Sequence, residues 1–147
     1  MNFTSATKSV VKSDASIAAS ATHSVEIDTL GFAHASIDVV FSPFTAATSV
    51  AASVLRLAQS DSSGSGQTNI TGAVGGTDFT VSAGSTTGSV VGYVHRFDVD
   101  LRGKSRYLTV YASPGNTVAV STVARLGKGE AGPVSATTKN VNTQAVV

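Results

Sequence analysis

The chain has 147 residues, which suits a single domain with a core of its own, and no cysteine, so neither a disulfide framework nor a thiolate metal site can form. Ten basic and nine acidic residues leave a net charge of +1, which is too small for the basic surface that nucleic acids or anionic membranes require. Charged residues make up only 13% of the chain, so we expect a neutral, hydroxyl-rich surface and neither nucleic acid nor a membrane as partner.

Residues 1–14 lack a strong periodicity and are predicted to form an N-terminal arm ahead of a β-sandwich domain over residues 15–126. The domain begins with a short strand over Ser24–Asp28, and a turn at residues 29–31 leads into a strand over residues 33–41. In this second strand every other residue is apolar, from Ala33 to Phe41. Such a period of two predicts one face packed on a core and one mixed face outside.

The segment from Ala46 to Gln59 is ambiguous, because its alanine-rich first half could open a helix whereas residues 53–58 alternate like a strand. We interpret the second half as a strand. A Ser/Gly loop is expected over residues 60–67, followed by a turn-rich passage through Gly72, Gly75 and Gly76. A short strand over residues 78–81 and a second Gly/Ser/Thr loop over residues 83–89 complete this part of the chain.

Three further strands are predicted over residues 90–100, 106–112 and 117–126. His95 shares one face of the first of them with Tyr93 and Phe97, and we interpret it as a histidine at the edge of the core whose polar tip is satisfied. Ser113-Pro114-Gly115-Asn116 predicts a hairpin turn between the last two strands.

About seven or eight strands with no long helix predict an all-β fold, namely a jelly-roll or Greek-key β-sandwich. Residues 127–147 are again without periodicity and rich in small polar residues, so they are predicted to form a flexible C-terminal arm, like residues 1–14 at the other end. Simple terminal disorder and ordering on a neighbouring subunit are both open for these arms.

No motif in the chain carries chemistry. His23, His34 and His95 are too far apart in sequence for a local metal motif, and neither a phosphate-binding loop nor a nucleophile elbow occurs. We therefore predict no catalytic residue, no cofactor, no metal site and no small-molecule substrate, and we expect that the protein is not an enzyme.

Charged residues gather around one turn. Asp98 and Asp100 lie two apart, on one face of a strand, just before Arg102, Lys104 and Arg106. A paired acid/base or hard-metal site is one interpretation of the carboxylates, but ion pairing across a solvated turn is favoured. The three cations could also contact a partner subunit.

Two segments resemble a known family. Leu55-Arg56-Leu57-Ala58-Gln59-Ser60-Asp61 precedes the Ser/Gly loop, and Phe97–Val110 combines a strand, a basic turn and an aromatic-led strand. Together, across roughly residues 24 to 126, this arrangement resembles small structural proteins of tailed bacteriophages. The resemblance implies a head-decoration, or cement, protein: a β-sandwich that clusters as homodimers or homotrimers on the capsid exterior and bridges neighbouring major capsid subunits. No catalytic residues come with that family.

The resemblance thus implies the major capsid protein and a second copy of the chain as partners, and the exterior of the virion as the location. The candidate contact residues lie in the two arms and the basic turn: Val10, Val11, Arg102, Lys104, Arg106, Val146 and Val147. One alternative is a carbohydrate- or receptor-binding β-sandwich, since jelly rolls host such sites. Another is a different virion component, such as a head-fibre base, tail or spike protein.

Overall fold

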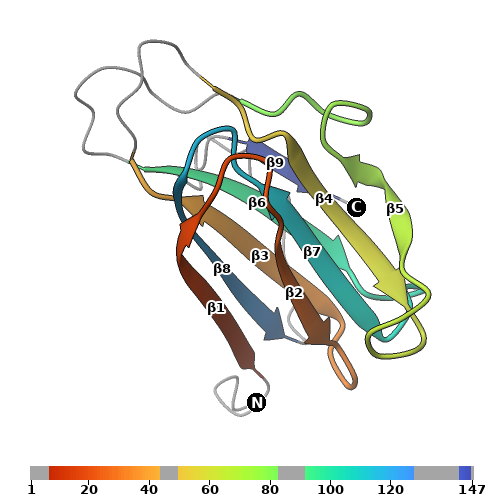
Figure 1. Ribbon diagram of the computed structural model, residues 1–147. Coiled ribbons are helices and arrows are strands. Elements are labelled where there is room, and N and C mark those ends of the chain that lie inside the picture. The colour runs from red at the N-terminus through yellow and green to blue at the C-terminus, as the bar shows by residue number, and fades with distance from the viewer. Residues whose placement is uncertain (1–6, 44–49, 83–91, 128–142, 147) are drawn as a thin grey trace.

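The computed structural model describes residues 7–43, 50–82, 92–127 and 143–146, and the regular secondary structure of these residues is entirely β (Figure 1). The strands are β1 (Lys8–Ile17), β2 (His23–Asp28), β3 (His34–Phe41), β4 (Val54–Ser60), β5 (Thr68–Val74), β6 (Tyr93–Asp100), β7 (Tyr107–Ser113), β8 (Val118–Gly127) and β9 (Thr143–Val146).

The strands form two packed sheets. Sheet A has the order β1-β8-β3-β6-β9, and sheet B has the order β2-β7-β4-β5. From β1 to β8 every connection crosses from one sheet to the other, except the hairpin between β4 and β5. This crossing pattern is that of a jelly roll, so the predicted fold class is confirmed.

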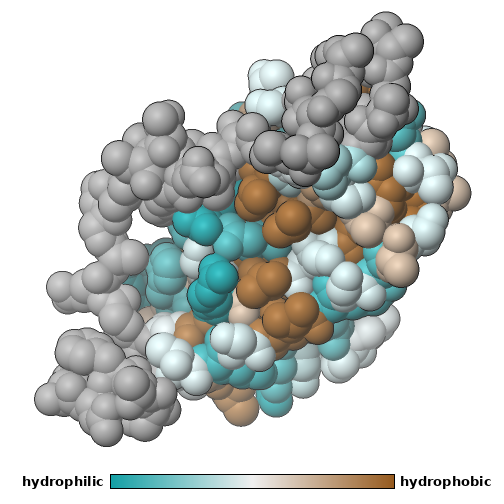
Figure 2. Space-filling view, turned by 90° about the vertical axis from the view of Figure 1, so that its left-hand side faces the viewer, coloured by the Kyte–Doolittle hydropathy of each residue, from teal (hydrophilic) through white to brown (hydrophobic). Residues whose placement is uncertain are grey.

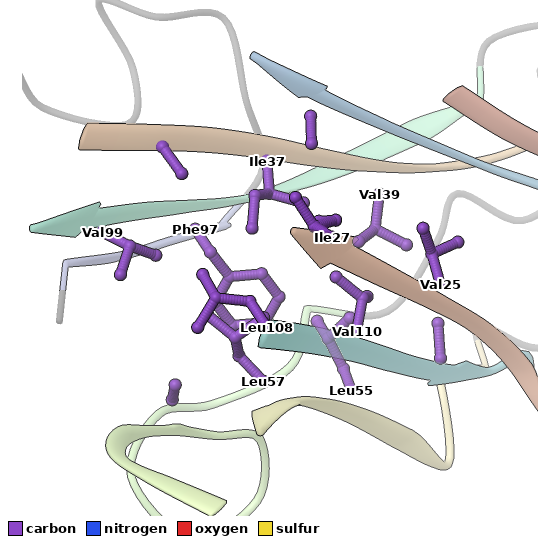
Figure 3. Packing of buried hydrophobic residues seen from close by; sticks show 14 of the residues in the cluster. Val25, Ile27, Ile37, Val39, Leu55, Leu57, Phe97, Val99, Leu108 and Val110 are labelled. Carbon is purple, nitrogen blue, oxygen red and sulfur yellow. The ribbon is translucent and has the colours of Figure 1, made fainter. Parts of the chain in front are cut away.

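The core lies between the two sheets (Figure 3). Ile37 and Val39 of β3 and Phe97 of β6 face Ile27 of β2 and Leu108 of β7, and the accessible surface of each is nearly zero. The alternation predicted for residues 33–41 and 90–100 is confirmed over His34–Phe41 and Tyr93–Asp100, because alternate side chains of a strand point to opposite faces and only one face here meets the other sheet. Residues 90 and 91 lie outside the described residues.

The turn Ser113–Asn116 reverses the chain, but the predicted hairpin is wrong. β7 pairs with β2 and β4 in sheet B, whereas β8 pairs with β1 and β3 in sheet A. A Pro-Gly turn signals a reversal and does not say whether the returning strand joins the same sheet. Here the turn packs against the segment just before β4, because a Cβ atom on Gly115 would clash with the carbonyl oxygen of Ala51.

Two of the weaker strand predictions also fail. Residues 68–74 form β5, where only turns were expected, and residues 78–81 contribute no strand beyond an isolated bridge between Gly75 and Phe79. The irregular β4–β5 pairing hides the period of two: Ile70 and Ala73 are both buried although they are three residues apart. The strand half of segment 46–59 is confirmed as β4, whereas residues 44–49 and loop 83–89 lie outside the described residues.

The N-terminal boundary differs from the prediction. Residues 8–14, assigned to the arm, belong to β1, which pairs antiparallel with β8 from Lys8 to Asp14. β1 is an edge strand with only Val10 and Ile17 packed against the core, so its weak apolar pattern resembles that of an unstructured arm. The C-terminal arm likewise contains a strand, β9, which pairs in parallel with β6 at the far edge of sheet A.

Candidate interaction surface

Side chains of β1 close one side of the sandwich. The ammonium groups of Lys8 and Lys12 donate hydrogen bonds to the backbone carbonyls of Asp28 and Ser24, at 2.9 and 3.0 Å. Because β1 ends sheet A and β2 ends sheet B, these two bonds join edge strands that share no ladder. Two carbonyls on the outer edge of β2 thereby receive hydrogen bonds from lysines of the other sheet.

A buried polar cluster lies beside these lysines. Nδ1 of His23 is 2.6 Å from a carboxylate oxygen of Asp14, and its Nε2 is 2.9 Å from the hydroxyl of Thr122. The hydrogen bond with His23 is the main cause of a lowered pKa for Asp14. The cluster connects β1, β2 and β8 and was missed in the sequence, since its members are far apart along the chain.

A carboxylate, an imidazole and a hydroxyl in this order also make up a catalytic triad, in which the imidazole activates the hydroxyl as a nucleophile. The side chains of His23 and Thr122 are, however, completely buried, and Thr122 points into the core with its neighbours Val120 and Ala124. No substrate atom can reach that hydroxyl without opening the sandwich. The cluster therefore supports the fold by satisfying polar groups between the sheets.

A second charged cluster lies on the outer face of sheet A. Asp38 of β3 accepts hydrogen bonds from Arg96 of β6 and from Arg125 of β8, with 2.9 Å to a guanidinium nitrogen of each. The side chain of Asp38 is 9% exposed, that of Arg96 18% and that of Arg125 60%. The hydrogen bond with Asp38 raises the pKa of Arg96. The cluster thus holds three adjacent strands together.

Ion pairing at the basic turn is confirmed for Asp100 and Arg102, whereas Arg106 has a partner outside the turn. Arg102 pairs with Asp100 at 2.6 Å, and this hydrogen-bonded pair lowers the pKa of Asp100 to about 2. Arg106 instead pairs with Asp28 of β2 at 2.7 Å, which lowers the pKa of that carboxylate. Lys104 is half-buried in the turn, and its backbone N–H donates to the carbonyl of Leu101. Two of the three cations therefore already have carboxylate partners within the chain.

The predicted apolar contacts have different surroundings. Val10 is partly buried against the core, whereas Val11 points outward from β1 and is 63% exposed. Val146 lies in β9 beside Asp98, and Val147 lies outside the described residues. Between Val10 and Val11, whose side chains the structure describes, Val11 is thus the one that presents an apolar side chain to solvent.

Val11 is one of four valines that lie on the outer face of sheet A beside the charged cluster of Asp38. It lies opposite Val123 of β8, and on neighbouring strands Val40 lies opposite Val94. Figure 2 shows hydrophobic side chains gathered in the middle of the side of the molecule on which β1 lies, among hydrophilic and intermediate ones. We call Val11, Val40, Val94 and Val123 the valine face.

The outer face of sheet B is different. Tyr107 and Tyr111 of β7 are half-buried there, and a guanidinium lies over each ring, that of Arg106 at 4.9 Å from the centroid and that of Arg56 at 4.2 Å. The Ser/Gly loop folds over the same sheet, because a carboxylate oxygen of Glu26 accepts a hydrogen bond of 2.7 Å from the backbone of Gly64. This face is polar and partly covered by its own chain.

His95 differs from its interpretation as a satisfied histidine. It is 1% exposed, neither ring nitrogen has a hydrogen-bond partner, and burial lowers its pKa to about 4. The rings of Phe41 and Tyr93 enclose it edge to face, with centroids 5.8 and 5.5 Å away. A titratable group so enclosed cannot exchange protons with a substrate.

An open hollow of about 470 Å³ lies between the start of β4 and the segment after β5. Its one carboxylate, that of Asp78, already accepts the backbone N–H groups of Gly72 and Val74 at 2.9 and 3.0 Å. Among the described residues no group of three or more His, Cys, Asp or Glu could hold a metal ion, and no helix is long and apolar enough to cross a membrane.

The comparisons with known proteins give no relative. No family model matches the chain, and no curated protein and no solved structure is similar to it.

Proposed function

We propose that this protein is a non-enzymatic structural component of a virus particle, which decorates a bacteriophage capsid by binding across neighbouring subunits of the major capsid protein. The observation that carries the proposal is the valine face. Val11 is 63% exposed and Val40, Val94 and Val123 are partly exposed, whereas Asp38 beside them is hydrogen-bonded to Arg96 and Arg125 of the same chain. Such a surface fits association with another protein better than chemistry on a small molecule.

The jelly-roll architecture and the resemblance of segments 55–61 and 97–110 to phage structural proteins support the same function. The mechanism is thermodynamic. A subunit that binds the assembled lattice better than its free subunits stabilises the lattice by linkage. Charge contributes little to this contact, because Arg102 and Arg106 are already paired within the chain.

Cosedimentation with capsids that lack the protein tests the proposal. Wild-type protein should saturate at a fixed ratio to the major capsid protein, and Val11→Lys should bind at least about tenfold more weakly, because a lysine in a packed apolar contact must be desolvated. Val54→Lys is the matched control, since Val54 is also exposed, at 37%, but lies on sheet B. Failure of the wild-type protein to bind, or equal loss in both variants, would contradict the proposal.

A second candidate is a carbohydrate-binding module, favoured by the two tyrosines on sheet B. Aromatic rings beside polar groups are typical of sugar sites, but a guanidinium lies over each ring here. A glycan array separates the candidates: binding that is lost in Tyr111→Ala and kept in Val11→Lys would favour the carbohydrate function.

A further inference from the structure

The C-terminal strand β9 is unlike the other strands. It pairs in parallel with β6, whereas every other strand pairing in the described part of the chain is antiparallel. The jelly roll is complete without it, since β1 to β8 already supply four strands to each of the two sheets. β9 is therefore an added strand on an edge that β6 would otherwise expose (Figure 1).

The segment that connects β8 to β9 is longer than the path requires. β8 ends at Gly127. Its partner on β3, His34, is also the partner of Asp100 on β6, so Gly127 and Asp100 lie at the same height in the sheet. β9 starts five residues away along β6, beside His95. Five residues along the sheet and three strand spacings across it amount to about 22 Å. The connection from residue 127 to residue 143 can extend to roughly 50 Å. The same segment can therefore reach an equivalent edge on an adjacent molecule.

We propose that the edge of β6 is a strand-accepting site, and that residues 143–146 of a second copy of this chain occupy it by reciprocal exchange. The exchanged strand makes the same backbone hydrogen bonds as it makes within its own chain, so the exchange keeps the β6–β9 ladder. Reciprocal exchange gives a two-fold symmetric pair in which each copy completes sheet A of the other. This inference concerns the contact between two copies and does not depend on the proposed capsid partner.

Concentration controls the exchange. Within one chain the tether gives β9 an effective concentration in the millimolar range, so the closed monomer competes with the exchanged pair until copies are similarly crowded. A lattice that holds copies side by side would supply such crowding. The measurement must therefore be made near 1 mM protein, where the two forms compete on equal terms.

The absence of cysteine from the chain allows a direct cross-linking test. Asp98 and Val146 are Cα partners in the β6–β9 register, so Asp98→Cys in one full-length chain and Val146→Cys in another can join only between molecules. Under mild oxidation the two variants should form a disulfide heterodimer on the order of tenfold faster than Ser121→Cys mixed with Val146→Cys. Ser121 lies on β8, away from the β9 edge, and reports random collisions.

A proline pair provides the second arm of the test. Gln144→Pro with Ala145→Pro, placed in the Val146→Cys chain, removes the N–H groups that a ladder needs and should lower the rate to the collision level. The matched control, Gln144→Ala with Ala145→Ser, should keep the fast rate. Heterodimer formation no faster than the collision control, or a fast rate that survives the proline pair, would overturn the inference.

Discussion

Replacing His95 with phenylalanine should stabilise the protein, and the gain should increase as the pH falls. Both ring nitrogens of His95 are buried without partners, and an unsatisfied buried polar group costs about 1–3 kcal/mol. A phenyl ring would keep the edge-to-face contacts with Phe41 and Tyr93, while its larger volume offsets part of the gain. We expect a net stabilisation of about 1 kcal/mol at pH 7.

The pH dependence of the effect follows from linkage. Burial lowers the pKa of His95 from 6.5 to about 4, so between these values the unfolded chain binds a proton that the folded protein does not. The stability of the wild-type protein must therefore fall as the pH drops below about 6.5, by about 3 kcal/mol between pH 7 and pH 4. The phenylalanine variant has no proton to bind there and lacks this loss.

Urea unfolding of both proteins at several pH values between 4 and 7 measures the difference directly. Asp14, Asp28 and Asp100 also have lowered pKa values, so their contributions to stability are lost on acidification, but this loss is common to both proteins and cancels. Thr109→Val is the control, because the hydroxyl of Thr109 is also buried without a partner but does not titrate. That variant should gain about 1 kcal/mol at every pH. Parallel pH curves for wild type and His95→Phe would refute the reasoning.

Three further substitutions test other parts of the structure. Asp38→Ala should lower the free energy of unfolding by about 3 kcal/mol, because it removes the carboxylate that accepts hydrogen bonds from the largely buried guanidinium of Arg96. Arg125→Ala, at an exposed side chain, should cost less than about 1 kcal/mol, and urea denaturation compares the two variants. Gly115→Ala should lower the melting temperature, at a cost of about 2 kcal/mol, because the new methyl group would clash with Val50 and with the backbone of Ala51, just before β4. Glu26→Ala should change global stability by less than about 1 kcal/mol but should speed hydrogen exchange at Gly64; unchanged exchange there would contradict the anchoring of the loop.

The sequence predicted those parts of the fold where one face of a strand is buried. The alternation from Ala33 to Phe41 and around Phe97 identified β3 and β6, because burial of one face imposes a period of two. β5 was missed because its pairing with β4 is irregular, and β1 because an edge strand needs few apolar residues. The sheet to which each strand belongs depends on contacts between distant residues, so the turn at Ser113–Asn116 could not show that the chain crosses between sheets.

The polar clusters could not be predicted from the sequence for the same reason, because their members are far apart along the chain. Asp14 and Thr122 flank His23 from opposite ends of the chain, and only the antiparallel pairing of β1 with β8 brings them together. For Asp38 and Arg96 the sequence indicates only that each lies on the mixed outer face of its strand, and it does not show that the two strands are neighbours. The basic turn was predicted more closely, because the pairing of Asp100 with Arg102 is local.

The arrangement of these clusters bears on what the surface can bind. Several charged side chains in the described part of the chain are paired with one another, Asp38 with Arg96, Asp28 with Arg106, and Asp100 with Arg102. A partner that relied on these charges would have to break such a pair, which costs energy without new contacts in return. The valine face and the β6 edge offer apolar area and backbone hydrogen bonds instead, and neither kind of contact weakens when salt screens charge. Binding through these surfaces should therefore persist at 1 M salt, where the screening length falls to about 3 Å. Cosedimentation at low and high salt measures this, and loss of binding at high salt would place the contact on the charged turn instead.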